Sequence, residues 1–157
     1  MWSKTPDQFA GKPRKKKKRE RPKLTAGRRE KVDFPDLGLF GLTAKLDTGA
    51  YTTALHCSHV RIENGVLIFR LLDETHPEYQ DREHHFSEFD RKQVRNSFGE
   101  EELRYIVRTR ICMGSRTIKS IVSLSDRGNM RYPVLIGRRL LHGRFLVDVS
   151  LENALEA

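Results

Sequence analysis

Hydrophobic and polar positions alternate along much of the chain after residue 31, which is typical of half-buried β-strands. In the segment LTAKLD, residues 42–47, Leu42, Ala44 and Leu46 fall on one face. The longer segment LRYIVRTRICM, residues 103–113, places a set of mostly apolar side chains on one face, namely Tyr105, Val107, Thr109, Ile111 and Met113. A last strand is predicted in RFLVDVS, residues 144–150. The pattern predicts a mainly β fold.

Turn residues join these predicted strands into hairpins. Asn64-Gly65 separates two apolar segments and is a strong signal for a tight hairpin turn. Gly114-Ser115 separates a second such pair. The segment GRRLLHG, residues 137–143, suits one short helix. We therefore expect a mainly β, barrel-like domain with one short helix near its C-terminal end.

Residues 73–101 are polar and poorly periodic. Connections inside compact domains are usually much shorter, and long ones are often functional or mobile. We therefore expect this segment to have a function or to move, rather than merely to connect two strands.

The positive charge is concentrated at the N-terminus. Residues 1–31 carry 13 Lys and Arg against three acidic residues, whereas residues 32–157 carry 17 against 18. The N-terminal segment also has almost nothing to bury, so we predict a disordered basic tail over residues 1–30 and one domain over residues 31–157. Residues 12–31 are expected to attract RNA, the ribosome or an acidic peptide. The alternative is a tail that only aids solubility.

Several protein classes are disfavoured by composition. None of the apolar runs approaches the ~20 residues of a membrane-spanning helix, and the N-terminus lacks the apolar region of a secretory signal. We therefore expect a cytoplasmic protein without a membrane partner. Its two cysteines, Cys57 and Cys112, are too few for a disulfide framework and are expected to be reduced.

The tetrapeptide Asp47-Thr48-Gly49-Ala50 is the first candidate for chemistry. It follows a predicted strand, and Gly49 permits a tight turn. Its carboxylate could activate water if a second carboxylate shared a proton with it. The alternative is an acidic residue in an Asx turn at the end of a strand. The tetrapeptide alone does not decide between the two.

Metal and nucleotide chemistry are poorly supported. The densest group of potential ligands is His56, Cys57 and His59, with His84 and His85 further along. On a regular strand His56 points away from Cys57 and His59, so only two ligands would share a face. The chain contains neither H-E-x-x-H nor G-x-x-x-x-G-K-[ST]. We therefore expect no metal and no cofactor.

A second motif gives Asp47 a partner. Residues 133–141, PVLIGRRLL, pair an apolar strand and a glycine with the predicted helix. Together with the tetrapeptide Asp47-Thr48-Gly49-Ala50, this late motif resembles the sequence pattern of the retropepsin-like aspartic proteases. The segments 45–56, 94–107 and 135–150 resemble, more narrowly, a bacterial family labelled as ATP-dependent zinc proteases and linked with RimK-type ligases. The resemblance covers about residues 31–150.

The resemblance implies a closed retropepsin-like barrel and an aspartic-type endopeptidase with a regulatory role on a protein substrate. Because the chain has one Asp-Thr-Gly, two copies of Asp47 would have to meet in a homodimer. Thr48 would brace the two loops, and the backbone at Gly49 would meet the substrate. Three residues would support the loop from behind, namely Leu135, Ile136 and Gly137.

The resemblance also raises expectations about neighbouring positions. Ala50 cannot donate a hydrogen bond to the carboxylate as a serine could, which favours activity nearer neutral pH. Tyr51 replaces an acidic residue that usually pairs with the arginine of the late motif, so Arg138 is expected to lack that partner. A flap is expected within residues 84–101, with Phe98 and Gly99 near its turn. A plain surface loop is the alternative.

Two other functions stay open. The same fold could be a catalytically silent binding module, tethered by its basic tail to RNA, the ribosome or an acidic protein. It could also be a structural dimeric domain in which Asp47 is only a turn residue. Substitution of Asp47 separates these possibilities from a peptidase.

Overall fold

The computed structural model describes residues 21–95, 99–126 and 131–156. Most of this part of the chain is β-structure, and its one α-helix is α2 (Arg138–Leu141), which confirms the predicted fold class. The strands are β1 (Leu24–Ala26), β2 (Arg29–Phe34), β3 (Leu39–Leu46), β4 (Thr53–Glu63), β5 (Val66–Leu71), β6 (Glu83–Phe86), β7 (Asp90–Arg95), β8 (Glu101–Met113), β9 (Arg116–Ser125), β10 (Val134–Ile136) and β11 (Phe145–Val147). A short 3-10 helix, η1 (Pro35–Leu37), links β2 to β3.

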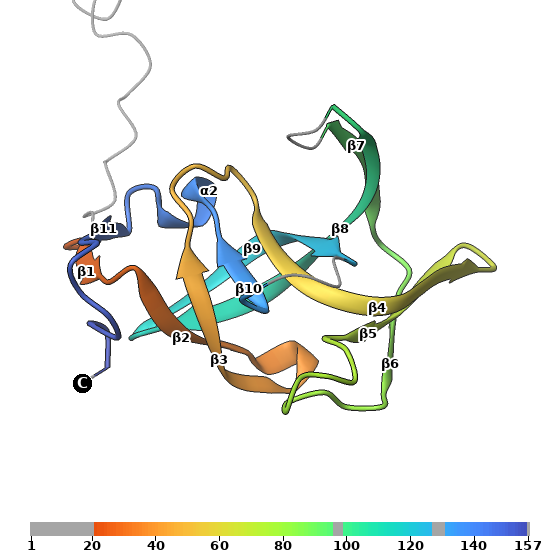
Figure 1. The fold of residues 1–157 in the computed structure, drawn as a ribbon, viewed down its shortest axis with the longest axis horizontal. Coiled ribbons are helices and arrows are strands. Elements are labelled where there is room, and N and C mark those ends of the chain that lie inside the picture. The colour runs from red at the N-terminus through yellow and green to blue at the C-terminus, as the bar shows by residue number, and fades with distance from the viewer. Residues whose placement is uncertain (1–20, 96–98, 127–130, 157) are drawn as a thin grey trace, which may run out of the picture.

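The predicted closed barrel is confirmed. Its strands follow the order β10-β3-β2-β8-β9-β4, and the barrel closes because β10 also pairs with β4 (Figure 1). β10 is parallel to β3 and antiparallel to β4, although it comes late in the chain. This late strand thus fills the gap between the two strands that flank the Asp47 loop. A separate parallel pair, β1 and β11, lies beside the barrel.

The alternation in β8 corresponds to its burial in the structure. Val107, Ile111 and Met113 are almost fully buried, whereas Arg108 and Arg110 on the opposite face are exposed. The inward-facing side chains form a continuous apolar core with residues of the other barrel strands. The period of two in the sequence therefore identified the core face of this strand correctly.

Both predicted hairpins are present. β4 and β5 are joined by Asn64 and Gly65, whose φ angles of 50° and 75° match a turn that needs two left-handed residues. β8 and β9 are joined at Gly114, where φ is 60°. Among the residues that the structure describes, no helix is both long and apolar enough to cross a membrane.

The ordered domain begins earlier than residue 31, so the predicted tail boundary is wrong for residues 24–30. β1 and the start of β2 lie in this segment, and Glu30 is fully buried. Its carboxylate accepts hydrogen bonds from the backbone N–H groups of Gly27 (3.1 Å), Ala154 (2.9 Å) and Leu155 (2.9 Å). A charged residue in a basic segment is buried here because backbone donors satisfy it. Residues 1–20 lie outside the described part.

The polar segment 73–101 contains two strands that the alternation did not predict, β6 and β7. β7 pairs with the first residues of β8, from Arg95 opposite Glu101 to Asp90 opposite Ile106. Figure 1 shows this hairpin standing clear of the barrel, on the same upper side as the β3–β4 loop. Gly99 lies exposed in its turn with a φ of 78°, and Phe98 lies outside the described residues. A hairpin therefore occupies the span in which a flap is expected.

Candidate active site

Asp47 sits at the end of β3 in a tight turn. The backbone N–H of Ala50 donates to the carbonyl of Asp47 at 3.1 Å, and the N–H of Gly49 donates to Oδ1 of Asp47 at 3.1 Å. Thr48 and Gly49 are exposed at the tip of this turn. The turn is therefore an Asx turn that also presents a carboxylate beside two exposed residues. The local geometry is compatible with both hypotheses for this tetrapeptide.

The late motif lies directly behind this turn. The backbone N–H of Asp47 donates to the carbonyl of Ile136 at 2.8 Å, and Leu135 pairs with Lys45 in the parallel β3–β10 ladder. The N–H of Gly137 donates to Oγ1 of Thr53 at 3.2 Å. Two segments that are about ninety residues apart thus fix the backbone on which Asp47 is carried.

Arg138 reaches over the same turn. Its Nη1 donates to the carbonyls of Thr48 (3.2 Å) and Gly49 (3.0 Å), and its guanidinium lies 5.8 Å from the centre of the Tyr51 ring. Its backbone N–H donates to the carbonyl of Ala50 at 2.8 Å. The expected loss of the acidic partner does not leave Arg138 without contacts, because two carbonyls and an aromatic ring replace it.

A cavity of about 510 Å³ opens beside the Asp47 turn. Its lining includes Leu46, which precedes Asp47, and Leu135 of β10. The remaining lining residues are mostly cationic or apolar, namely Arg28, Arg29, Lys45, Arg131, Tyr132 and Val149. We refer to this cavity as the Asp47 pocket. Cationic and apolar side chains therefore share one cavity next to the turn that carries Asp47, although Asp47 itself is not among the lining residues.

Part of the Asp47 pocket is held in place by polar contacts. Nη1 of Arg29 donates to the Tyr132 hydroxyl at 3.2 Å, and the side chains of Arg28 and Arg29 both pair with Glu152. The sequence did not reveal this pocket, since its cations come from separate segments and two of them lay in the predicted tail. A useful signal was the pair Arg28-Arg29 at the start of β2.

The potential metal ligands are dispersed in the structure. Cys57 is fully buried, and burial raises the pKa of its thiol to about 12, so it does not supply a thiolate at neutral pH. His59 is exposed, because a bulge between Ser58 and Arg61 and a φ of 52° at His59 interrupt the alternation. The prediction that Cys57 and His59 share a face is therefore wrong.

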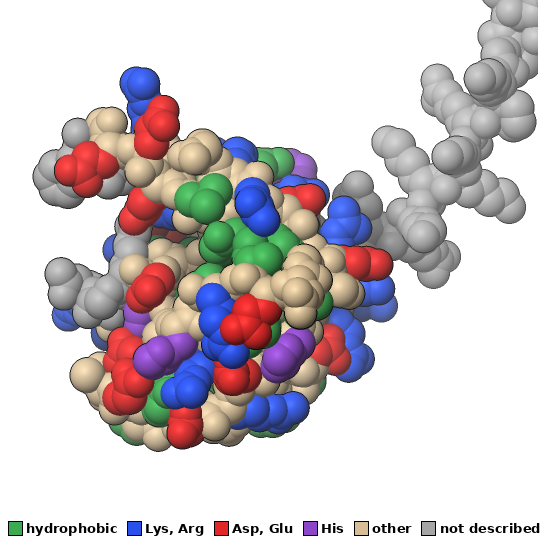
Figure 2. Space-filling view, turned by 90° about the vertical axis from the view of Figure 1, so that its right-hand side faces the viewer, with side chains coloured by type: hydrophobic (Ala, Val, Ile, Leu, Met, Phe, Trp, Pro, Cys, Tyr) green, Lys and Arg blue, Asp and Glu red, His purple; other side chains and the backbone are tan. Residues whose placement is uncertain are grey.

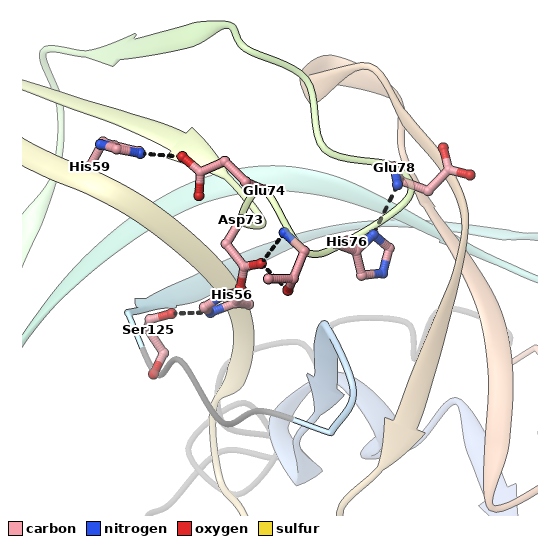
Figure 3. Close-up of polar contacts among 8 residues, drawn as sticks. His56, His59, Asp73, Glu74, His76, Glu78 and Ser125 are labelled. Atoms are coloured by element: carbon pink, nitrogen blue, oxygen red, sulfur yellow. Dashed lines mark hydrogen bonds and ion pairs between the residues drawn. The ribbon is translucent and has the colours of Figure 1, made fainter.

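His56 is occupied by other partners, as Figure 3 shows. Its Nδ1 lies 3.1 Å from the carbonyl oxygen of Ser125, and its Nε2 lies 2.6 Å from Oδ2 of Asp73. His56 therefore links the end of β9, through the Ser125 carbonyl, to the β5–β6 connection, through the Asp73 carboxylate.

His84 and His85 do not form a group of metal ligands either. His84 is buried against the ring of Phe69, with 5.8 Å between ring centres, and burial lowers the pKa of its imidazole. His85 is the next residue of the same strand and is exposed. Within residues 21–95, 99–126 and 131–156, no three His, Cys, Asp or Glu side chains lie close enough to hold a metal ion.

Comparisons with known proteins place the chain in a family. A family model described as RimB-like, retropepsin-like aspartic endopeptidase RimB, matches residues 25–155. The matched region contains both the Asp47 turn and the late motif behind it. The match begins within β1, as the ordered domain does, rather than at residue 31.

Curated relatives share this region as part of a longer protein. A protein named probable alpha-L-glutamate ligase from Parasynechococcus marenigrum is 32% identical over 134 residues, covering 80% of this chain and 28% of its own length. Proteins of the same name from Desulfotalea psychrophila and Shewanella pealeana are 28% and 30% identical, covering 85% and 82% of this chain and 30% and 29% of theirs. The chain thus spans less than a third of these relatives.

A solved structure has a similar fold over its whole length. It is the crystal structure of a protein of unknown function (DUF785) from Legionella pneumophila, with 27% sequence identity and a TM-score of 0.66. The similarity covers 86% of this chain and 100% of that chain. The barrel described here therefore has a counterpart in a protein described as having unknown function.

Proposed function

The chain belongs to the RimB-like family of retropepsin-like aspartic endopeptidases, and we propose that it is a peptidase whose active site forms when two copies bring their Asp47 side chains together. One carboxylate of such a pair is ionised and takes a proton from a water molecule, and the other carboxylic acid hydrogen-bonds to the peptide carbonyl. The water then attacks the carbonyl carbon directly, without a covalent enzyme intermediate.

The observation that carries this proposal is the way the Asp47 turn is held. Ile136 fixes its backbone from behind, and Arg138 ties down two of its carbonyls, so the exposed tip is rigidly supported. An exposed tip that is anchored in this way is what a loop needs in order to hold its carboxylate against a second copy. The β7–β8 hairpin, on the same side of the molecule, is the proposed flap (Figure 1).

The Asp47 pocket suggests which peptides would be cleaved. Four cationic side chains line it, and because Arg28 and Arg29 pair with Glu152, Lys45 and Arg131 are the ones that would stabilise an acidic side chain next to the scissile bond. The relatives that share this domain are named alpha-L-glutamate ligases, which makes glutamate-containing peptides the first substrates to test. A regulatory role and a cytoplasmic location stay predictions.

The direct test is cleavage of a peptide library by wild type and by Asp47→Asn, followed by mass spectrometry. We expect wild type to cut peptides with Glu near the scissile bond, and Asp47→Asn to cut none while folding and self-associating normally. We expect Lys45→Glu to lower kcat/KM for a Glu-containing peptide by roughly tenfold. It should have little effect on the same peptide with Gln.

Asp81→Asn is the matched control, because the Asp81 side chain is 76% exposed and its partner among the described residues is Arg70. This variant should cleave as wild type does. Cleavage that survives Asp47→Asn would contradict the proposed site. Folded wild-type protein that cuts no peptide, yet still binds a partner through its N-terminal tail, would favour the catalytically silent binding module instead.

A further inference from the structure

We propose that a second site, on the side of the domain where β1 and β11 lie, binds the phosphate backbone of single-stranded RNA. The site is the cavity lined by Arg21, Lys23, Arg116, His142 and Gly143, with a volume of about 420 Å³. We refer to it as the cationic pocket. It has no lining residue in common with the Asp47 pocket, so the inference does not rest on the proposed peptidase activity.

Hydrogen bonds to two backbone carbonyls place the cationic pocket on the folded domain rather than in the tail. Nη2 of Arg116, at the start of β9, donates to the carbonyl of Pro22 at 2.6 Å. The N–H of Leu24 donates to the carbonyl of Arg144 at 3.0 Å. These two bonds hold residues 21–24 against the β8–β9 turn and the chain that follows α2. Arg21 and Lys23, which flank Pro22, are exposed there.

The charge of the cationic pocket differs from that of its surroundings. Figure 2 shows acidic and basic side chains mixed over one face of the domain, and residues 32–157 have 17 Lys and Arg against 18 acidic residues. In contrast, the lining of the cationic pocket contains no acidic side chain among the described residues. The pocket also continues the basic run at residues 12–23, which has nine Lys and Arg and one acidic residue.

The chemistry of this lining favours RNA over an acidic protein. Protein partners usually bind through desolvated aromatic or apolar anchors, and the cationic pocket offers only cations, a histidine and a glycine. Phosphates need no such anchor, because neutralising them releases condensed counterions. The protein is expected in the cytoplasm, where RNA is the abundant polyphosphate. A flexible single strand could present a phosphate to the pocket without a preformed groove.

The test measures binding of a fluorescent oligouridine to the full chain as a function of salt concentration. The key variant is Arg21→Ala/Lys23→Ala/Arg116→Ala, and the matched control is Arg82→Ala/Lys92→Ala/Arg108→Ala, which removes three exposed cations elsewhere. Each lost phosphate contact reduces the magnitude of the slope of log K against log salt by about 0.7, so the slope of the key variant should be smaller by about 2. The key variant should also bind at least roughly tenfold more weakly near 0.1 M salt. The control variant should bind nearly as wild type does.

Two results would overturn the inference. If the key variant bound oligouridine as wild type does, the tail alone would account for binding and the pocket would have no part in it. If poly-L-glutamate of matched charge displaced oligouridine at equal concentration, the site would be one for acidic protein. Should loss of Arg116 prevent folding, Lys23→Glu alone replaces the key variant and should weaken binding, while Lys92→Glu should not.

Discussion

The missing side chain at Gly137 lets two distant segments touch behind Asp47. A Cβ atom at this position would lie 2.6 Å from the carbonyl oxygen of Tyr51 and 2.7 Å from the carbonyl carbon of Thr52, both of them backbone atoms. Gly137→Ala should therefore push the Asp47 turn away from the strand that supports it. We expect a loss of about 2–4 kcal/mol in the free energy of unfolding, measured by urea denaturation, because backbone must move.

Gly65→Ala is the control for this substitution. Gly65 has a φ of 75°, but nothing lies within 4 Å of an added Cβ, so only the backbone conformation is penalised. Gly65→Ala should lower the free energy of unfolding by about 1 kcal/mol. Equal destabilisation by the two variants would mean that the close approach at Gly137 does not matter for stability.

Individual side chains also show what a sequence can and cannot predict about a site. The Asp47 turn and its support could be predicted, because each is a continuous motif. The cationic lining of the Asp47 pocket could not, since Arg29, Lys45 and Arg131 come together only when β2, β3 and the segment before β10 are assembled. The alternation failed at His59, because a bulge changes which face a residue occupies and leaves no clear mark in the sequence.

A strand could be predicted from the sequence where one of its faces is buried, and not where it is held by ladder hydrogen bonds alone. β8 was predicted because its inner face is buried in the core, and the β4–β5 hairpin because Asn64-Gly65 requires a particular turn. β7 was missed because only Val94 among its six residues is even partly buried. A hairpin that projects from the barrel makes ladder hydrogen bonds without an apolar face, so its sequence has no period of two.

The link between β9 and the β5–β6 connection gives a prediction about acid stability. In the folded state the pKa of Asp73 is lowered to about 2, chiefly by the Thr75 hydroxyl, and then by His56 and the Thr75 backbone N–H. An unfolded aspartate titrates near about 3.9. The ionised carboxylate therefore stabilises the fold fully above about pH 4, and this contribution is lost as the pH falls towards 2.

Asp73→Asn removes that carboxylate. We expect the variant to unfold at lower urea concentration than wild type at pH 6, and the difference to shrink between about pH 4 and pH 2. Asp81→Asn, at a side chain that is 76% exposed, should differ little from wild type throughout. If the difference in urea midpoint between wild type and Asp73→Asn stayed constant down to pH 2, the ionised carboxylate would not be what stabilises the link.

Considered as one body, the domain supplies half of the proposed active site. A single barrel carries one Asp47 turn, and its exposed tip, Thr48 and Gly49, is open to a second copy. If two copies of Asp47 must share a proton, a pair with one Asp47→Asn subunit is inactive. Inactive subunits added in excess should therefore capture the active ones and lower the rate, whereas a site complete within one chain would be unaffected.

The experiment mixes wild type with a ninefold excess of Asp47→Asn and follows peptide cleavage after the subunits have exchanged. With random pairing only about one wild-type subunit in ten finds a wild-type partner, so the rate per wild-type subunit should fall about tenfold. A matched excess of Asp81→Asn should leave that rate unchanged or raise it, because its pairs keep both Asp47 side chains. An unchanged rate with Asp47→Asn would contradict the shared site, since each barrel would then cleave peptides with its own residues alone.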